Sequence, residues 1–148
     1  GVMCLWTGLM EIAEKSGLLN IFARILRPVT KALFPKIKKE SSAMHAIVMN
    51  ITANFLGMSN AATPLGIIAM EELQKENTDK KTASNAMCMF VVLNTMSIQL
   101  IPATLTALRA SAGSAEPAEI TVPVWITSSA ALIVGITIVK ILERKKHL

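Results

Sequence analysis

The sequence predicts an all-α polytopic membrane protein with a re-entrant helical hairpin and broken transmembrane helices. Of its 148 residues 52% are hydrophobic and only 17% are charged, whereas about a quarter of a soluble domain is charged. Three long runs contain no Asp, Glu, Lys or Arg: residues 41–70, 82–108 and 120–139. A helix needs about 20 such residues to cross a bilayer. Polar residues and prolines interrupt the first two runs, and these interruptions predict breaks in the helices.

The first two segments precede the uncharged runs. The chain starts inside an apolar stretch, GVMCLWTGLM, so residues 1–15 are interpreted as the end of a helix and the sequence as an N-terminally truncated fragment. Residues 18–39 are predicted to form an amphipathic basic helix, with apolar residues at helical spacing on one side. Pro28 should kink this helix and Pro35 should end it. The helix either lies along the membrane surface or packs among loops without touching lipid.

The distribution of basic residues predicts the topology. Seven Lys and Arg residues occur between residues 15 and 39 and four more between 140 and 148, and such loops face the cytoplasm. The loop 109–119 has one Arg and two Glu, and we expect it outside. A transmembrane helix at 120–142 then returns the chain to a cytoplasmic C-terminus, and the segment 82–108 runs from inside to outside.

Residues 41–74 then start and end on the inner side, so one ordinary span is excluded. Two arms of roughly 15 residues each reach about 22 Å, enough to enter the bilayer and return. The tip is GMSNAATP, where Gly57 is expected to end the first helix. Ser59 or Asn60 should cap the second helix, and Pro64 should lie in its first turn. Irregular backbone at membrane depth is tolerated only where it is buried in protein or lines a cavity.

The segment 82–108 is predicted to be a second broken membrane helix. Within FVVLNTMSIQLIPATL the apolar pattern is interrupted by Asn94, Thr95, Ser97, Gln99 and Pro102. Two interrupted hydrophobic segments in one chain indicate a transport site near the bilayer midplane.

Polar residues of the hairpin gather at its break. Asn50 and Asn54 are four apart, on one helical face, and Asn60 and Thr63 follow at the tip. These side chains either contact a solute or hold helices together, as polar residues in membranes commonly do. Because unpaired amides in hydrocarbon cost several kcal/mol, we expect Asn60 and Asn94 to approach one another.

Other chemistry has little support. The uncharged runs contain no carboxylate for general acid–base catalysis, so we expect neither a catalytic residue nor a cofactor. His45 has no second His or carboxylate at metal-binding spacing, and no metal site is expected. The basic residues flank apolar runs without aromatic interleaving, which argues against nucleic acid as a partner.

Two stretches, NITANFLGMSNAATPLGIIAMEELQ and NTMSIQLIPATLTALRASAGSAEP, resemble the spore maturation protein A family. That family belongs to the wider nucleoside-recognition, or Gate, group. The likeness covers nearly the whole chain, from GLMEIAEKSGLL through RPVTKALFP to the final helix. The family's motif residues correspond here to Asn54, Gly57, Asn60, Thr63, Pro64, Gly66, Asn94, Thr95, Ser97 and Pro102.

The resemblance implies a multi-pass protein of the bacterial inner membrane that works with a homologous subunit, spore maturation protein B, in dehydration of the spore core. We therefore expect a subunit of a membrane transport or gating complex, embedded in the lipid bilayer. Its partner would be a spore maturation protein B-like subunit or a second copy, and its small solute is unknown. Two alternatives are a non-conducting membrane scaffold and a nucleoside-type solute transporter unrelated to sporulation.

Overall fold

The computed structural model describes residues 8–9, 11–12, 15–96, 99–100 and 102–145. Every regular element in these ranges is a helix, which confirms the all-α class. The helices are α2 (Leu18–Leu33), α3 (Ser42–Phe55), α4 (Ser59–Glu76), α5 (Asn85–Met96), α6 (Ala103–Ser111), the 3₁₀ turn η1 (Pro117–Ile120) and α7 (Thr121–Lys145). Most of the helix end predicted at residues 1–15 lies outside the described residues, as does Ser97.

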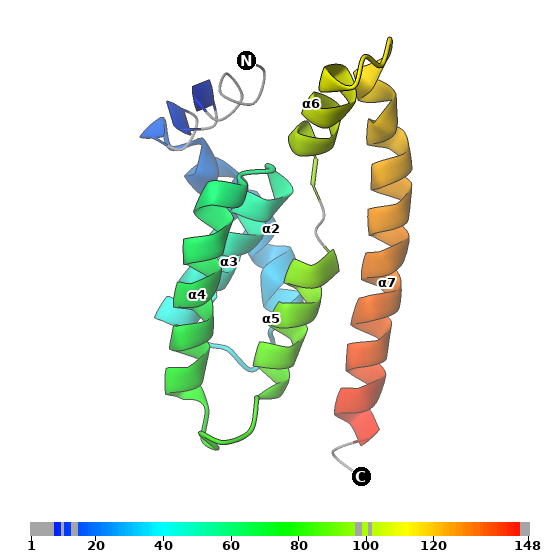
Figure 1. Cartoon of the computed structure of the whole chain (residues 1–148). Helices are drawn as coiled ribbons and strands as arrows, with labels where there is room; N and C mark the ends of the chain where they lie inside the picture. The colour runs from blue at the N-terminus through cyan, green and yellow to red at the C-terminus, as the bar shows by residue number, and fades with distance from the viewer. Residues whose placement is uncertain (1–7, 10, 13–14, 97–98, 101, 146–148) are drawn as a thin grey trace.

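Helices α3 and α4 form a tight hairpin (Figure 1). Gly57 has a φ of 74°, a left-handed conformation that glycine adopts without steric cost. Its N–H donates to the Asn54 carbonyl at 3.0 Å, and the Met58 N–H donates to the Ala53 carbonyl at 2.8 Å. This pair of hydrogen bonds is the Schellman arrangement that satisfies the free carbonyls of a helix end. Gly57 therefore ends the first arm, as the sequence predicts.

The start of α4 differs from the prediction. Its N-cap is Met58, so Ser59 and Asn60 are the first two residues of the helix and not the cap. The Met58 carbonyl itself accepts the Ala62 N–H at 2.9 Å, so the turn leads directly into the next helix. Pro64 is the sixth residue of α4 and not part of its first turn. Because proline has no N–H, it removes the helical donor to the Asn60 carbonyl.

Helix α3 is the centre of the molecule and packs against α2, α4 and α5. Its buried residues lie on all sides of the helix: Ala43, Met44, Ala46, Ile47, Val48, Asn50, Thr52 and Ala53. A helix that is apolar all round is typical of a buried core element. The Ser41 hydroxyl caps its first turn by accepting the Met44 N–H at 3.2 Å.

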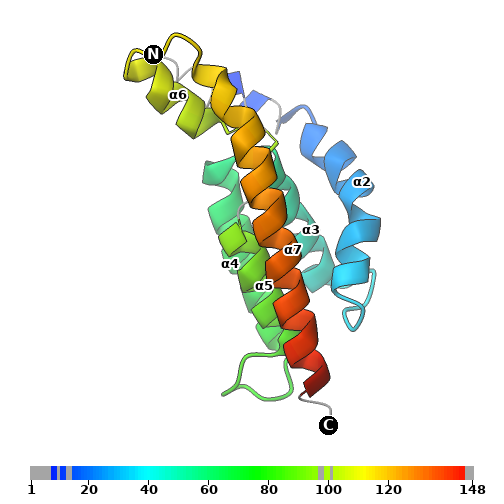
Figure 2. The same cartoon turned by 90° about the vertical axis from the view of Figure 1, so that its right-hand side faces the viewer.

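Helix α2 packs along α3. Leu19, near its beginning, lies in the cluster at the hairpin tip with Leu56 and Met58. Phe34 and Ile37, which follow it, lie in the main cluster with Met44 and Leu73 towards the other end. The helix thus runs the length of the hairpin (Figure 2).

Helix α2 is shorter than the predicted range 18–39. Pro28 lies inside α2, which ends at Leu33, before Pro35.

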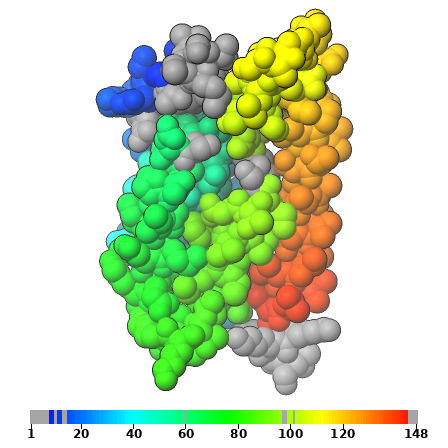
Figure 3. Space-filling model, viewed as in Figure 1, coloured from blue at the N-terminus to red at the C-terminus, as the bar shows by residue number. Residues whose placement is uncertain are grey.

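The second broken segment is divided into α5 and α6. Pro102 is the N-cap of α6 and not an interior residue that breaks a helix, so the break precedes it. Helix α7 packs closely on α5 (Figure 3). A Cβ at Gly135 would lie 2.7 Å from the terminal methyl of Met96 and 3.0 Å from the Val92 side chain, so a larger residue here would displace the Met96 side chain.

One helical stretch within the described residues, Pro117–Arg144, is long and apolar enough to cross a membrane, and Asn85–Met96 is a shorter apolar helix. Only 11% of the apolar window of the long helix is buried. Its exposed large apolar side chains are Val122, Trp125, Ile126, Ile133, Val134, Ile138, Ile141 and Leu142. A large exposed apolar surface of this kind marks an interaction with lipid or another protein.

The connections gather at two ends (Figures 1 and 2). The segment 34–41, the loop 77–84 and the C-terminal end of α7 share one end, here called the base. The hairpin tip and α6 lie towards the other end.

Candidate functional site

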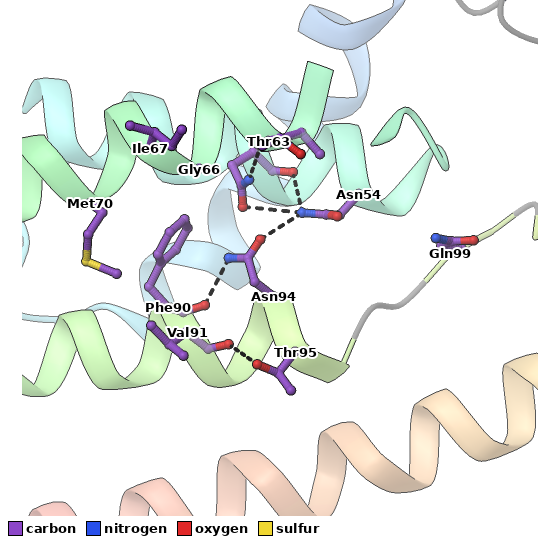
Figure 4. Close-up of a pocket in the computed structure, with 12 residues that line it drawn as sticks. Asn54, Thr63, Gly66, Ile67, Met70, Phe90, Val91, Asn94, Thr95 and Gln99 are labelled. Atoms are coloured by element: carbon purple, nitrogen blue, oxygen red, sulfur yellow. Dashed lines mark hydrogen bonds between the residues drawn. The ribbon is translucent and has the colours of Figure 1, made fainter. Parts of the chain in front are cut away.

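Three asparagine amides connect the hairpin to α5 (Figure 4). The Asn54 amide nitrogen donates to Asn94 Oδ1 at 2.9 Å. It also lies 3.2 Å from the carbonyl and 3.4 Å from the Oδ1 of Asn50. Asn94 Nδ2 donates to the Phe90 carbonyl at 2.9 Å, and Asn50 Nδ2 donates to the Ala62 carbonyl at 2.8 Å. Asn50, Asn54 and Asn94 form what we call the amide cluster.

The cluster depends on a close approach of α3 and α4. Asn50 is 1% exposed, and a buried amide needs hydrogen-bond partners. Its partner, Ala62, is one helical turn before Gly66 on α4. A Cβ at Gly66 would lie 3.0 Å from Asn50 Nδ2, so the absent side chain at Gly66 makes room for the amide.

A cavity of about 530 Å³ opens beside the cluster. Its lining comes from α3, α4, α5 and the break after α5: Asn50, Asn54, Ala62, Thr63, Gly66, Ile67, Met70, Phe90, Val91, Asn94, Thr95 and Gln99. None of these side chains is charged. A second cavity, of about 160 Å³, is mostly apolar. It is lined by Leu26, Val29, Thr30, Leu33, Asn50, Ile51, Asn54, Phe55, Leu93, Asn94 and Leu132.

The amide cluster belongs to the walls of both cavities. The larger cavity extends between α4 and α5, and the smaller one extends towards α2 and α7. The Asn54–Asn94 hydrogen bond therefore joins the two helices that the cavities share, α3 and α5. The bond lies in a wall that the two cavities have in common.

The chemistry of the site is that of neutral hydrogen bonding. An asparagine amide offers two donor hydrogens and an acceptor oxygen. Asn54 Oδ1 accepts no hydrogen bond from the described residues and can receive one from a solute. Within those residues no group of three His, Cys, Asp or Glu side chains is arranged to hold a metal ion. The lining therefore presents neutral donors and acceptors.

The second break is attached to the first. The Leu100 N–H donates to the carbonyl of Phe55, the last residue of α3, at 2.7 Å. The Leu100 carbonyl accepts the indole N–H of Trp125 on α7 at 2.9 Å. The first bond satisfies one of the carbonyls that every helix end leaves free. Sequence reasoning missed both residues, although a tryptophan N–H in an apolar helix signals that an acceptor must be near.

Six of the predicted site residues line the larger cavity: Asn50, Asn54, Thr63, Gly66, Asn94 and Thr95. Gln99, which the sequence shows as an interruption, lines it too. Gly57 shapes the hairpin tip and Pro102 begins α6, both outside this lining.

The predicted approach of Asn60 to Asn94 is wrong, because another asparagine of the hairpin is the partner of Asn94. Asn94 bonds to Asn54, whereas Asn60 is exposed and outside the cavity lining. Asn54 lies in the last turn of α3, which packs against α5, while Asn60 lies in the first turn of α4 and faces away. Pro64 is also exposed. Ser97 lies outside the described residues.

Two comparisons with known proteins identify the family of the chain. A family model described as nucleoside recognition, named Gate, matches residues 1–111. The chain belongs to the Gate family. It is also 48% identical over 122 residues to spore maturation protein A of Bacillus subtilis (strain 168). The aligned region covers 82% of this chain and 62% of that relative. The resemblance predicted from the sequence is thereby confirmed.

The Gate match includes the hairpin and both breaks, and ends at the last residue of α6. All the residues of the amide cluster lie inside it, whereas Trp125 lies outside. No solved structure is significantly similar to the chain.

Proposed function

We propose that this chain is a subunit of a bacterial inner-membrane transport or gating complex for a small uncharged solute. The amide cluster, which lines two cavities at once, carries the proposal. In it the Asn54–Asn94 hydrogen bond is the closing contact of the gate. A solute entering the larger cavity replaces this bond with its own donors and acceptors, so that the two side chains separate without leaving unpaired amides.

Nucleosides are our first candidate solutes. Nucleoside recognition is the description of the Gate family, and a nucleoside is neutral and carries several donors and acceptors. A cavity of about 530 Å³ is within the range of small-molecule sites. The Bacillus subtilis relative is named spore maturation protein A, and the resemblance links that family to spore core dehydration. Such a role would make this solute flux part of spore maturation.

The membrane arrangement follows the charges of the chain. In our proposal α7 spans the bilayer and the α3–α4 hairpin is re-entrant, with the base on the cytoplasmic side. A span needs about 20 predominantly apolar residues, and the helical stretch Pro117–Arg144 is long and apolar enough to supply them. The broken backbone after α5 is tolerated at membrane depth because Leu100 is bonded on both sides.

The larger cavity points to a partner. Thr63 and Ile67 of α4 are exposed at its edge, and lipid would leave the polar lining poorly solvated. A homologous subunit resembling spore maturation protein B, or a second copy of this chain, would complete the wall.

A second candidate function is a non-conducting membrane scaffold. The observation in its favour is that the amides bond to one another, as they would if they only held helices together. The two functions predict different effects when the Asn54–Asn94 hydrogen bond is lost. In a scaffold the loss lowers only the stability of the protein, whereas in a gate it also changes the solute flux.

Uptake of labelled uridine and adenosine into liposomes tests the proposal. The liposomes contain the chain together with its spore maturation protein B-like partner, and Asn54→Ala and Asn94→Ala are compared with Asn20→Ala, which alters an exposed asparagine of α2. We expect uptake by the wild type and Asn20→Ala, and at least a tenfold loss, on the order of 1.4 kcal/mol, in the two cluster variants.

Equal uptake by all four proteins would show that the cluster is no gate. Absence of uptake above empty liposomes, with lowered stability of the two cluster variants, would support the scaffold.

A further inference from the structure

We propose that a cationic recess near the base binds the phosphate group of an anionic phospholipid. The recess has a volume of about 530 Å³ and lies between α2 and the start of α3. Its lining consists of Arg24, Arg27, Pro28, Lys31, Lys39, Glu40 and Met44. Four cationic side chains thus face one carboxylate, and none of the four forms an ion pair with it. This site is separate from the amide cluster.

Two of the cations are held in place by backbone carbonyls. Arg27 Nη2 donates to the Lys39 carbonyl at 3.0 Å. Lys31 Nζ donates to the carbonyl of Pro35 at 3.3 Å and to that of Ile37. A guanidinium has five N–H donors in a planar fork, so Arg27 keeps donors for a phosphate. Positioned cations lose little side-chain entropy when an anion binds.

The other two cationic side chains have no hydrogen-bond or ion-pair partner among the described residues. These are Arg24 and Lys39, and both residues are exposed. Arginine and phosphate form strong charge-assisted hydrogen bonds. The recess therefore has fixed cations at one side and free cations at the other.

An apolar row beside the cations favours a lipid over a soluble anion. Ile21, Ile25 and Val29 are 59%, 62% and 57% exposed. Their spacing of four places them in one row along α2, and Pro28 of the recess is next to Val29. A free phosphate would use only the cations, whereas a phospholipid also covers this row with an acyl chain.

The position of the recess fits a lipid headgroup. It adjoins the segment 34–41, at the end that also contains the loop 77–84 (Figure 2). The membrane orientation proposed above, on which this inference rests, puts that end at the cytoplasmic leaflet. Anionic lipids of that leaflet attract basic segments by about 1 kcal/mol per Lys or Arg.

Vesicles of phosphatidylcholine, alone or mixed with phosphatidylglycerol, test the inference. The measured quantity is the ratio of the two lipids retained by the purified protein in native mass spectrometry. We expect Arg24→Gln/Lys39→Gln to lower the preference for phosphatidylglycerol about 30-fold, the equivalent of about 2 kcal/mol for two cations. The control Lys38→Gln/Lys81→Gln removes two exposed cations outside the recess and should keep the wild-type preference.

A charge-conserving variant, Arg24→Lys/Lys39→Arg, should keep most of the preference. This result would show that the glutamine variant loses the preference through loss of charge and not through misfolding. Equal losses in the glutamine variant and its control would overturn the site in favour of general surface charge. Thermal stabilisation by inorganic phosphate in phosphatidylcholine vesicles, equal to that by phosphatidylglycerol, would overturn the lipid in favour of a soluble anion. Nucleoside flux is measured separately, so failure of the gate and failure of this site are distinguishable.

Discussion

At the scale of single residues, Asn50 and Gly66 share one narrow space between the two arms of the hairpin. Gly66→Ala should favour the helix by up to about 1 kcal/mol. The new Cβ, 3.0 Å from Asn50 Nδ2, would displace that amide from the Ala62 carbonyl and cost about 1 kcal/mol. We therefore expect almost no net effect on unfolding free energy in the wild type. With Asn50→Ala present, the same change should stabilise by about 0.5–1 kcal/mol.

Denaturant unfolding in detergent micelles measures this difference. Gly135→Ala is the control, because its Cβ would meet Met96 and Val92 and not Asn50. Its effect should be the same with and without Asn50→Ala. Additive effects for Gly66→Ala and Asn50→Ala would contradict the close packing described here.

Part of the site could be predicted from residue types and spacing. Asn50 and Asn54 had to share a helical face, and Asn94 had to find a polar partner at a similar depth. Which partner it found could not be deduced, because Asn54 and Asn60 are close in sequence and the helix directions decide between them. Asn54 points towards α5 and bonds to Asn94, while Asn60 is exposed. Local spacing predicts a face but not the neighbour across it.

At the scale of elements, the hairpin turn and the start of its second arm respond oppositely to alanine. Gly57 has a φ of 74°, where a Cβ costs about 1–2 kcal/mol, so Gly57→Ala should destabilise by that amount. Pro64 lies inside α4, where proline costs up to about 3 kcal/mol relative to alanine. Pro64→Ala restores the donor to the Asn60 carbonyl and should stabilise.

Thermal unfolding of the two single variants checks this pair. Gly113→Ala is a matched control for Gly57→Ala, because Gly113 also has positive φ, 81°, at a helix end away from the hairpin. Equal stability of Gly57→Ala and the wild type would contradict the left-handed turn. If Pro64→Ala is stable but loses solute flux, the weakened helix start is part of the gate.

The elements themselves were more predictable than their connections. Uncharged runs and prolines indicate the two breaks, but not that the Leu100 N–H bonds to Phe55 and its carbonyl to Trp125. These bonds join residues 45 and 25 positions apart, and no local pattern specifies them. They attach the break after α5 to the end of α3 and to α7, in addition to the packing of α7 on α5.

At the scale of the whole molecule, the charges differ between the two ends. The segments 34–41 and 77–84 of the base carry five lysines against Glu40 and Asp79, whereas the other end carries Arg109 of α6 with Glu116 and with Glu119 of η1. Arg109 is also engaged locally, because its Nη2 donates to Ser114 Oγ at 3.2 Å. Basic loops remain in the cytoplasm, so the asymmetry predicts which end faces inward.

The orientation leads to a labelling prediction. In a background of Cys4→Ser and Cys88→Ser, single variants Lys39→Cys, Lys80→Cys and Ala115→Cys are exposed in intact cells to a thiol reagent that does not cross the membrane. We expect labelling of Ala115→Cys alone, because the proposed orientation puts the base in the cytoplasm and the loop 112–116 outside. In permeabilised cells all three should react, since all three positions are exposed. Residues 39 and 80 belong to the segment 34–41 and the loop 77–84, which flank the hairpin at the same end (Figure 2). Labelling of one but not the other from outside would therefore mean that the α3–α4 hairpin crosses the bilayer and is not re-entrant.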